Sequence, residues 1–236
     1  MVVYNYFSKI SFKASIVILD FEDSFTYNIF STLVQMGIAE NNIEVIPYKN
    51  VLAFLKNCNL VKANTQEDEN NERLVLIYGP GPGHPSDYQH LYGEIKRLLL
   101  NRSIFHLGIC LGHQILWNII GFEVKRSDKP LHGQVTPFCI PHWSGIFPQK
   151  FWSKQIEVQC YNSLVVDTFS FIQKFPAIKK FDLVLQCLEN QRSFNCMAGR
   201  FERGVTYQFH PESIATSERF LFFKGILKFL SKKKNY

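Results

Sequence analysis

The segment Gly108-Ile109-Cys110-Leu111-Gly112 has the residue types of a nucleophile turn. Cys110 follows an apolar, strand-like run, precedes a helix-like run, and has a glycine two residues away on each side. A nucleophile on a sharp strand-to-helix turn has a strained backbone and needs close neighbours without side chains. The amino end of the next helix favours a thiolate, and the Leu111 amide points where an oxyanion would form. The segment predicts covalent catalysis by Cys110, although a buried cysteine beside a tight turn gives the same pattern.

A second candidate element is His210-Pro211-Glu212. A cysteine nucleophile needs a base, and the base needs an acceptor that orients it. His210 can take the first role and Glu212 the second, and a separation of one hundred residues from Cys110 is ordinary for groups brought together by folding. A lone histidine near a strand end is more often structural, so this element is informative only together with Cys110.

The third element is the loop Gly79-Pro80-Gly81-Pro82-Gly83, followed by His84 and Pro85. Alternating glycine and proline make a rigid turn with accessible backbone amides. The loop lacks the lysine and the Ser/Thr of a phosphate-binding loop. After an apolar strand and upstream of Cys110, it can supply a second backbone donor to an oxyanion.

The elements that must position these residues alternate between strand and helix in the first half of the chain. Short apolar runs predict buried parallel strands at 15–20, 43–48, 74–78 and 103–109. Helical spacing predicts helices at 24–37, 50–58, 87–101 and 111–120, with Ser24 capping the first helix and Gly37 ending it. This alternation predicts right-handed crossovers and an α/β fold with a mostly parallel sheet.

The second half has a different texture. Strand-like runs at 134–140, 156–160, 183–188 and 204–209 are separated by Pro and Gly, which predicts a small antiparallel extension and one more core strand. An amphipathic helix is expected at 217–230. The polar stretch 61–73 has no periodicity and is interpreted as a surface loop.

Composition excludes several classes of protein. The 236 residues are 46% hydrophobic and 19% charged, as expected for a folded chain with a large core. The net charge of +6 has a concentration of lysines near the C-terminus, which we interpret as a solvated tail and not a nucleic-acid site. Six scattered cysteines form no metal-ligand pattern and favour a reducing, cytoplasmic setting. No apolar run is long enough to cross a membrane, and the N-terminus does not resemble a signal peptide.

Taken together and in this order, the three elements resemble the triad (class I) glutamine amidotransferases. The run from Asp20 to Asn28, DFEDSFTYN, is similar to the signature of anthranilate synthase component II and its aminodeoxychorismate synthase counterpart. His132-Gly133 and the segment 161–164, YNSL, match further segments of that subfamily. The resemblance covers about residues 15–230.

The resemblance implies a role for each matching residue. Cys110 would be the nucleophile, His210 its base and Glu212 the group that orients His210. The backbone amides of Gly83 and Leu111 would bind the oxyanion. L-glutamine would be held by Gly81, Pro82, Gly83, Gln114, Ser163 and Leu164.

The resemblance also implies a fold, an activity and a partner. We expect a flavodoxin-like mixed sheet with helices on both faces, in a domain over 15–231 between an N-terminal extension (1–14) and a basic tail (232–236). The expected activity is glutamine hydrolysis that supplies ammonia to a chorismate-using synthase subunit (component I) in a hetero-oligomer, with no metal or organic cofactor required. Anthranilate synthase is favoured over aminodeoxychorismate synthase. A stand-alone γ-glutamyl hydrolase and an inactive partner protein are the alternatives, against which the DSFTYN run and the intact Cys, His and Glu argue.

Several positions depart from the subfamily pattern. Phe21 replaces the usual Asn, Gln134 the usual Lys and Asn162 the usual His. The segment 200–207 is shortened, Thr206-Tyr207 replaces Gly-Val, and 61–73 resembles an insertion. None of these changes alters Cys110, His210 or Glu212.

Overall fold

The computed structural model describes residues 15–58, 73–168, 182–187 and 194–231. The expected N-terminal extension, the basic tail and residues 61–72 of the expected surface loop lie outside the described residues. None of the helices within the described ranges is long and apolar enough to cross a membrane.

Nine strands within the described residues form one mixed sheet, in the order β2-β1-β3-β4-β9-β8-β6-β5, with β7 also paired to β8. The parallel strands are β1 (Ile16–Asp20), β2 (Ile43–Pro47), β3 (Leu74–Tyr78), β4 (Ile104–Ile109) and β9 (Gly204–Tyr207). The antiparallel strands are β5 (Glu123–Cys139), β6 (Gln155–Asp167), β7 (Asp182–Cys187) and β8 (Phe194–Phe201). The expected mixed, mostly parallel sheet is confirmed.

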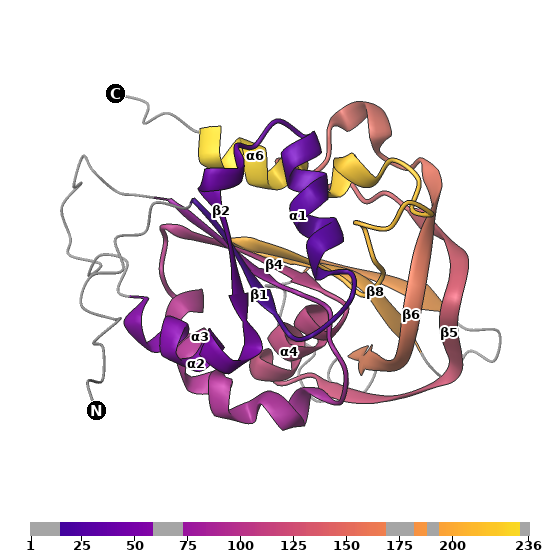
Figure 1. Ribbon diagram of the computed structural model, residues 1–236. Coiled ribbons are helices and arrows are strands. Elements are labelled where there is room, and N and C mark those ends of the chain that lie inside the picture. Colours follow the sequence, from indigo (N-terminus) through magenta and orange to yellow (C-terminus); the bar gives the residue numbers. More distant parts are fainter. Residues whose placement is uncertain (1–14, 59–72, 169–181, 188–193, 232–236) are drawn as a thin grey trace, which may run out of the picture.

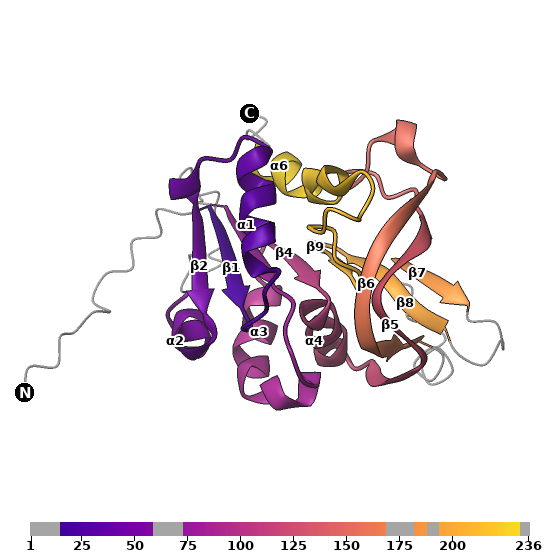
Figure 2. The same ribbon diagram turned by 45° about the vertical axis from the view of Figure 1, so that its right-hand side comes forward.

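Helices cover both faces of the parallel region (Figures 1 and 2). On one face lie α1 (Thr26–Gln35) and α6 (Lys224–Ser231), and on the other lie α2 (Tyr48–Asn57), α3 (Tyr92–Leu99) and α4 (Leu111–Ile120). Strand β3 is buried along its whole length, because helices pack on both sides of it. The sheet therefore separates two cores, one beneath α1 and α6 and the other beneath α2, α3 and α4.

Three expectations about helices are wrong in detail. Ser24 does not cap α1: the helix begins after Phe25 without a side-chain cap, and Asp23 accepts a hydrogen bond from the Phe25 amide instead. The expected single helix at 87–101 is a 3-10 helix at Pro85–Leu91 followed by α3, because His84 caps the turn ahead of Pro85. The expected helix at 217–230 is likewise a 3-10 turn, Arg219–Phe223, followed by α6.

Gly37 ends α1 as expected, with φ of +90°.

The second half forms a long antiparallel arm that continues the sheet. Strands β5 and β6 pair along most of their length and curve away from the parallel region (Figure 2). Irregular pairing between Arg126 and Leu131 and between His132 and Gln134 bends this hairpin. The expected strands at 134–140 and 156–160 are thus parts of longer ones, because β5 also includes polar residues that break the apolar alternation.

Candidate active site

The three elements singled out in the sequence follow three neighbouring parallel strands. The Gly79–Gly83 loop follows β3, Cys110 follows β4, and His210 comes three residues after β9. The sheet order places β4 between β3 and β9. Because the carboxyl ends of parallel strands meet at one edge, the structure brings all three elements to the same place.

The backbone at Cys110 has the strained geometry expected of a nucleophile turn. Cys110 has φ of +50° and ψ of −103°, in a region that residues with a side chain rarely adopt. Its two glycine neighbours explain how the turn fits. A Cβ atom on Gly112 would lie 2.0 Å from the Tyr78 carbonyl oxygen, and one on Gly108 would lie 2.8 Å from the Gly112 carbonyl oxygen. The amide of Cys110 donates to the Tyr207 carbonyl at 2.8 Å, which fixes the turn to β9.

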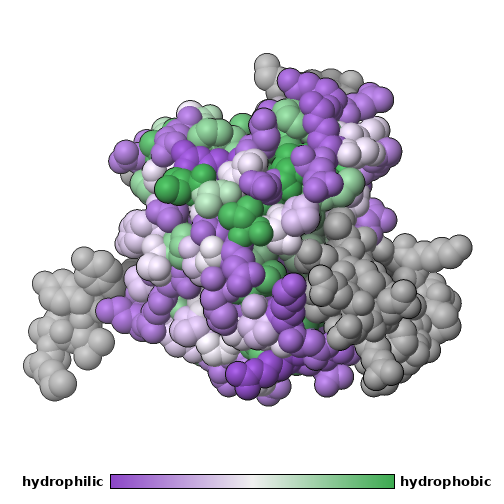
Figure 3. All heavy atoms as spheres, turned by 90° about the vertical axis from the view of Figure 1, so that its right-hand side faces the viewer, coloured by the Kyte–Doolittle hydropathy of each residue, from purple (hydrophilic) through white to green (hydrophobic). Residues whose placement is uncertain are grey.

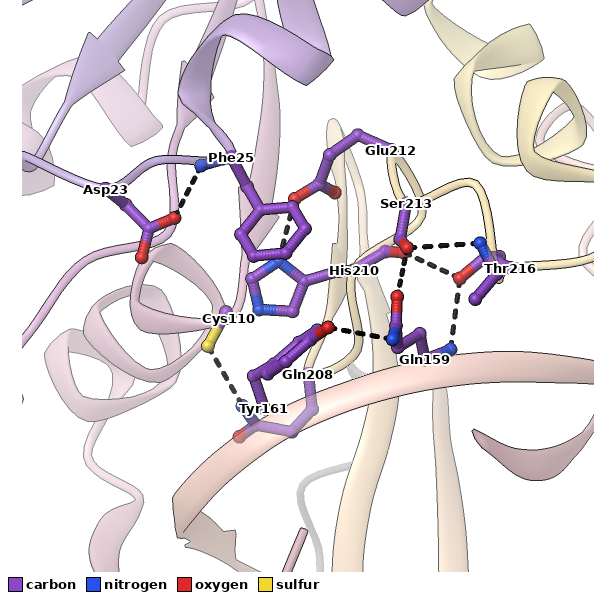
Figure 4. A network of polar contacts seen from close by, with 11 residues as sticks. Asp23, Phe25, Cys110, Gln159, Tyr161, Gln208, His210, Glu212, Ser213 and Thr216 are labelled. Carbon is purple, nitrogen blue, oxygen red and sulfur yellow. Dashed lines mark hydrogen bonds and ion pairs between the residues drawn. The ribbon is translucent and has the colours of Figure 1, made fainter. Parts of the chain in front are cut away.

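His210 and Glu212 form a buried pair. The His210 Nδ1 and Glu212 Oε1 atoms are 2.7 Å apart, and both residues are almost fully buried. The other ring nitrogen faces the side of the site where the Cys110 sulfur lies (Figure 4). Burial opposes a charge on His210, but the Glu212 carboxylate and the Cys110 sulfur outweigh burial and raise the pKa of His210 well above its ordinary value. The imidazole is therefore protonated at neutral pH and can donate a proton.

Two aromatic rings pack against His210. The ring centroids of Phe25 and Tyr161 lie 4.8 Å and 5.4 Å from that of the imidazole. Phe25 comes from the turn before α1 and Tyr161 from β6, so the two halves of the molecule meet across the histidine (Figure 4). Both residues belong to motifs recognised in the sequence, but their contact with His210 was not predicted, because no local pattern reports a contact across so many residues.

Hydrogen bonds from β6 hold the segment that carries His210. The His210 amide donates to the Gln159 carbonyl at 2.8 Å, and the Gln159 side chain bonds both Ser213 and the Tyr161 hydroxyl. The Thr216 hydroxyl donates to the His210 carbonyl at 2.7 Å. His210 is thus positioned by the antiparallel arm as well as by β9.

A pair of glutamine side chains lies behind the cysteine. Gln208 Nε2 is 3.9 Å from the Cys110 sulfur, and Gln208 Oε1 accepts from Gln114 Nε2 at 3.1 Å. Gln114 also donates to the Leu164 carbonyl at 3.1 Å. Two of the expected substrate-binding residues, Gln114 and Leu164, are therefore in direct contact. The role of Gln208 was not foreseen, although it lies next to the His210 motif.

The Gly79–Gly83 loop packs against the turn that bears Cys110. The Gly112 amide donates to the Gly79 carbonyl at 3.1 Å. A Cβ on Gly81 would lie 2.6 Å from both the Leu111 side chain and Phe21. Gly83 and Pro82 are exposed, and Gly83 has φ of +79°. The expected oxyanion donors thus lie on two segments in contact, while Ser163, on β6, bonds His132 at 3.1 Å.

The departures at 206 and 162 have local partners. The Thr206 hydroxyl accepts from Trp117 Nε1 at 2.7 Å and contacts His113 Nδ1 at 2.9 Å, so it satisfies two buried polar groups that a glycine could not. Asn162 Nδ2 donates to the Leu164 carbonyl at 3.1 Å. These changes alter the packing behind the site and leave the groups around His210 in place.

Comparison with known proteins shows which family the chain resembles. A family model described as glutamine amidotransferase class-I matches residues 17–229. Anthranilate synthase component 2 of Lactococcus lactis is 30% identical, covering 85% of this chain and 87% of that protein. The Haemophilus influenzae protein of the same name is 28% identical, covering 86% and 91%. A putative aminodeoxychorismate synthase of Schizosaccharomyces pombe is 26% identical, but the match covers 93% of this chain and only 27% of that protein.

Solved structures share the fold at lower identity. A putative GMP synthase subunit from Thermoplasma acidophilum superposes with a TM-score of 0.65 at 18% identity, covering 93% of this chain and 95% of that chain. A glutamine amidotransferase from Thermotoga maritima gives a TM-score of 0.51 at 16% identity, covering 85% and 76%. These likenesses concern the arrangement of the strands and helices.

Proposed function

The chain belongs to the class-I glutamine amidotransferases, and from that premise we propose that it is the glutaminase subunit, component II, of an anthranilate synthase. It hydrolyses L-glutamine and supplies ammonia to a chorismate-using synthase subunit. The observation that carries the glutaminase activity is the meeting of a strained cysteine with a buried His–Glu pair at the ends of β4 and β9, and the similarity to anthranilate synthase component 2 proteins supports the choice of synthase.

The proposed reaction is acyl transfer through the cysteine. The Cys110 sulfur attacks the side-chain amide carbon of glutamine and forms a C–S bond. His210, which is protonated because its pKa is raised, gives its proton to the departing nitrogen, and ammonia leaves as the C–N bond breaks. Water, deprotonated by His210, then cleaves the glutamyl thioester and releases glutamate. Glu212 keeps the proton-bearing Nδ1 of His210 turned away from the sulfur.

Backbone amides are the proposed oxyanion donors. The Leu111 amide begins α4, where the helix dipole favours negative charge, and Gly83 lies on the loop that packs against Leu111. Each donor contributes a factor of about 10²–10³ in rate, as in other oxyanion holes. The substrate glutamine is held by Gly81, Pro82, Gly83, Gln114, Ser163 and Leu164.

The synthase subunit would dock on the side of the sheet where ammonia leaves. Two large apolar side chains that are close in sequence to residues of the site are exposed: Tyr27, two residues after Phe25, is 65% exposed, and Ile214, two residues after Glu212, is 90% exposed. Figure 3 faces the side on which β5 and β6 lie in Figure 1, and it shows apolar residues in small groups among polar ones. A chorismate-using component I would cover such groups in a cytoplasmic hetero-oligomer.

Aminodeoxychorismate synthase is the second candidate, because a relative with that name also aligns over most of this chain. Both functions use the same glutamine hydrolysis. They differ in the product that the synthase subunit makes from chorismate and ammonia. Supplying the purified complex with glutamine and chorismate separates them: accumulation of anthranilate supports the first, and accumulation of aminodeoxychorismate supports the second.

Replacement of Cys110 tests the glutaminase activity itself. We expect Cys110→Ala to reduce glutamate release to the background rate, because no other group can form the thioester. The matched control is Cys139→Ala, since Cys139 is an exposed cysteine on β5 and should be dispensable. A diazo ketone analogue of glutamine should label wild type at Cys110 alone. Glutamine hydrolysis by Cys110→Ala at the wild-type rate contradicts the proposal.

A further inference from the structure

A cavity of about 550 Å³ lies at the amino ends of the same strands that carry the candidate active site. Arg73 directly precedes β3, Arg102 lies two residues before β4, and Arg203 directly precedes β9. Because these strands are neighbours, their amino ends bring the three arginines to one cavity. The six residues of β4 separate this cavity from Cys110 by roughly 20 Å, so the two sites are distinct.

The lining of this cavity carries more positive than negative charge. Arg200 from β8 and Lys228 from α6 add to the three arginines, so five cationic side chains line it, and Glu202 is the single carboxylate among the lining residues. Glu202 lies 2.7 Å from Arg203, and Asp182, outside the lining, is 4.0 Å from Arg200. The lining keeps a net positive charge even after these two pairings, which favours an anion in the cavity.

Two arginines are held in place by the surrounding protein. Arg73 Nη1 donates to the Phe229 carbonyl at 2.6 Å, and its guanidinium lies 5.6 Å from the centre of the Phe229 ring. Arg203 Nη1 donates to Glu202 Oε1 at 2.7 Å, while its buried Nε has no hydrogen-bond partner among the described residues. Guanidinium groups fixed in this way lose little freedom when they bind an anion.

The rest of the cavity is partly apolar. Phe105, Ile146 and Phe229 line it together with Gly145, Gly204 and Gly225. The rings of Phe105 and Phe229 pack against each other with centroids 5.5 Å apart. The cavity therefore offers an apolar surface next to its cationic groups, a combination that suits an organic anion better than a bare inorganic ion.

We propose that this cavity binds a phosphorylated small molecule with an apolar body. A phosphate group carries a charge of about −1.5 to −2 near neutral pH and accepts paired hydrogen bonds from arginine. One phosphate can thus engage several of the five cations, while the apolar body packs on Phe105 and Phe229. A monoanion of the same shape engages the same cations more weakly.

Binding is tested by calorimetric titration of the full-length protein at low salt with phenyl phosphate, benzenesulfonate and inorganic phosphate. We expect phenyl phosphate to bind about tenfold more tightly than either of the others, a difference that corresponds to one charge-assisted hydrogen bond or one packed ring. Equal affinity for the sulfonate contradicts the phosphate assignment, equal affinity for inorganic phosphate contradicts the apolar surface, and absence of saturable binding overturns the proposal.

Variants locate the site. Arg102→Gln combined with Lys228→Gln should weaken phenyl phosphate binding about tenfold or more, because two exposed cations of the lining are lost. Lys49→Gln combined with Lys56→Gln removes the same charge from exposed positions on α2 and should leave affinity unchanged. Equal weakening in both pairs means that only the net charge matters and overturns the proposal. Cys110→Ala should bind phenyl phosphate as wild type does, and loss of binding there assigns the ligand to the catalytic site instead.

Discussion

A buried histidine lies near each edge of the parallel region: His210 after the carboxyl end of β9, and His106 near the amino end of β4. The two histidines have opposite charge states. Beyond the carboxyl end of β9, His210 bonds the Glu212 carboxylate, which with Cys110 raises the pKa of His210 despite burial. Nearer the amino end, His106 on β4 bonds the Tyr78 hydroxyl at 3.0 Å. Burial, with a smaller contribution from the Arg203 guanidinium, lowers the pKa of His106 to about 3, against a hydrogen bond with the Leu98 backbone that raises it. Burial is common to both, so the charge of the neighbours decides the protonation state.

A third histidine supports this conclusion. His113 on α4 is fully buried, and its Nδ1 contacts the uncharged Thr206 hydroxyl. Burial lowers the pKa of His113 to about 3 and outweighs a hydrogen bond with the Cys196 backbone, which raises it. The described part of the chain thus contains buried neutral histidines, His106 and His113, and a buried cationic histidine, His210, that can transfer a proton. A carboxylate two residues along the chain distinguishes the second kind from the first.

Glu212→Gln gives the largest effect that the comparison predicts. The neutral amide removes the larger of the two charges that raise the pKa of His210, so burial lowers that pKa and less of the imidazole is protonated at pH 7. We expect kcat/KM for glutamine to fall by about 10²–10⁴-fold, the range of general acid–base catalysis. Steady-state glutaminase assays across a pH series measure this loss. If Glu212→Gln keeps the wild-type pH profile and loses little kcat/KM, Glu212 does not set the protonation state of His210.

The sequence predicts the parallel region better than the arm. The strands at 15–20, 74–78 and 103–109 are continuous apolar runs because helices cover both faces, and each lies where expected. The strand β5 is less regular, since it includes Asp128, Lys129 and Pro130. Ser24 fails as a cap because Asp23 provides the local hydrogen bond.

The candidate site was predictable where its residues are adjacent in sequence. Gly108 and Gly112 report the turn at Cys110 directly, because a side chain at either position would collide with backbone. The contacts of Phe25 and Tyr161 with His210 depend on how the arm folds over the sheet. The cationic cavity was missed for a similar reason: Arg73, Arg102 and Arg203 are scattered until the strand order is known.

The second prediction concerns stability in mild acid. His106 and His113 have folded-state pKa values of about 3, below the ordinary 6.5, so they add nothing above pH 6.5. Below that pH these two histidines are protonated in the unfolded chain but stay neutral in the folded chain, which stabilises the unfolded state. Each histidine therefore lowers the free energy of unfolding by about 2 kcal/mol at pH 5. His210 has the opposite sign: its contribution is complete below pH 6.5 and is lost as the pH rises through its raised folded-state pKa.

Denaturant titrations at pH 7, 6 and 5 measure this decline, and NMR of the imidazole ring protons assigns it. We expect the His106 and His113 signals to keep the shifts of neutral rings in the folded protein down to pH 5. A titration midpoint above pH 5 for either ring would mean that burial does not dominate its pKa. The difference in pKa between that histidine and His210 could then not be assigned to Glu212 alone.

The smallest expected effect comes from Tyr161→Phe. This change keeps the ring that packs on His210 and removes the hydroxyl that accepts from Gln159 Nε2 at 2.8 Å. One partly exposed hydrogen bond contributes about 1 kcal/mol, so kcat/KM should fall by less than about tenfold. Tyr161→Ala removes the ring as well and should cost more, since His210 then loses one of its two aromatic neighbours. Equal losses in the two variants would assign the positioning of His210 to the Gln159 hydrogen bond, whereas a loss in Tyr161→Ala alone assigns it to ring packing, with Glu212 supplying the charge.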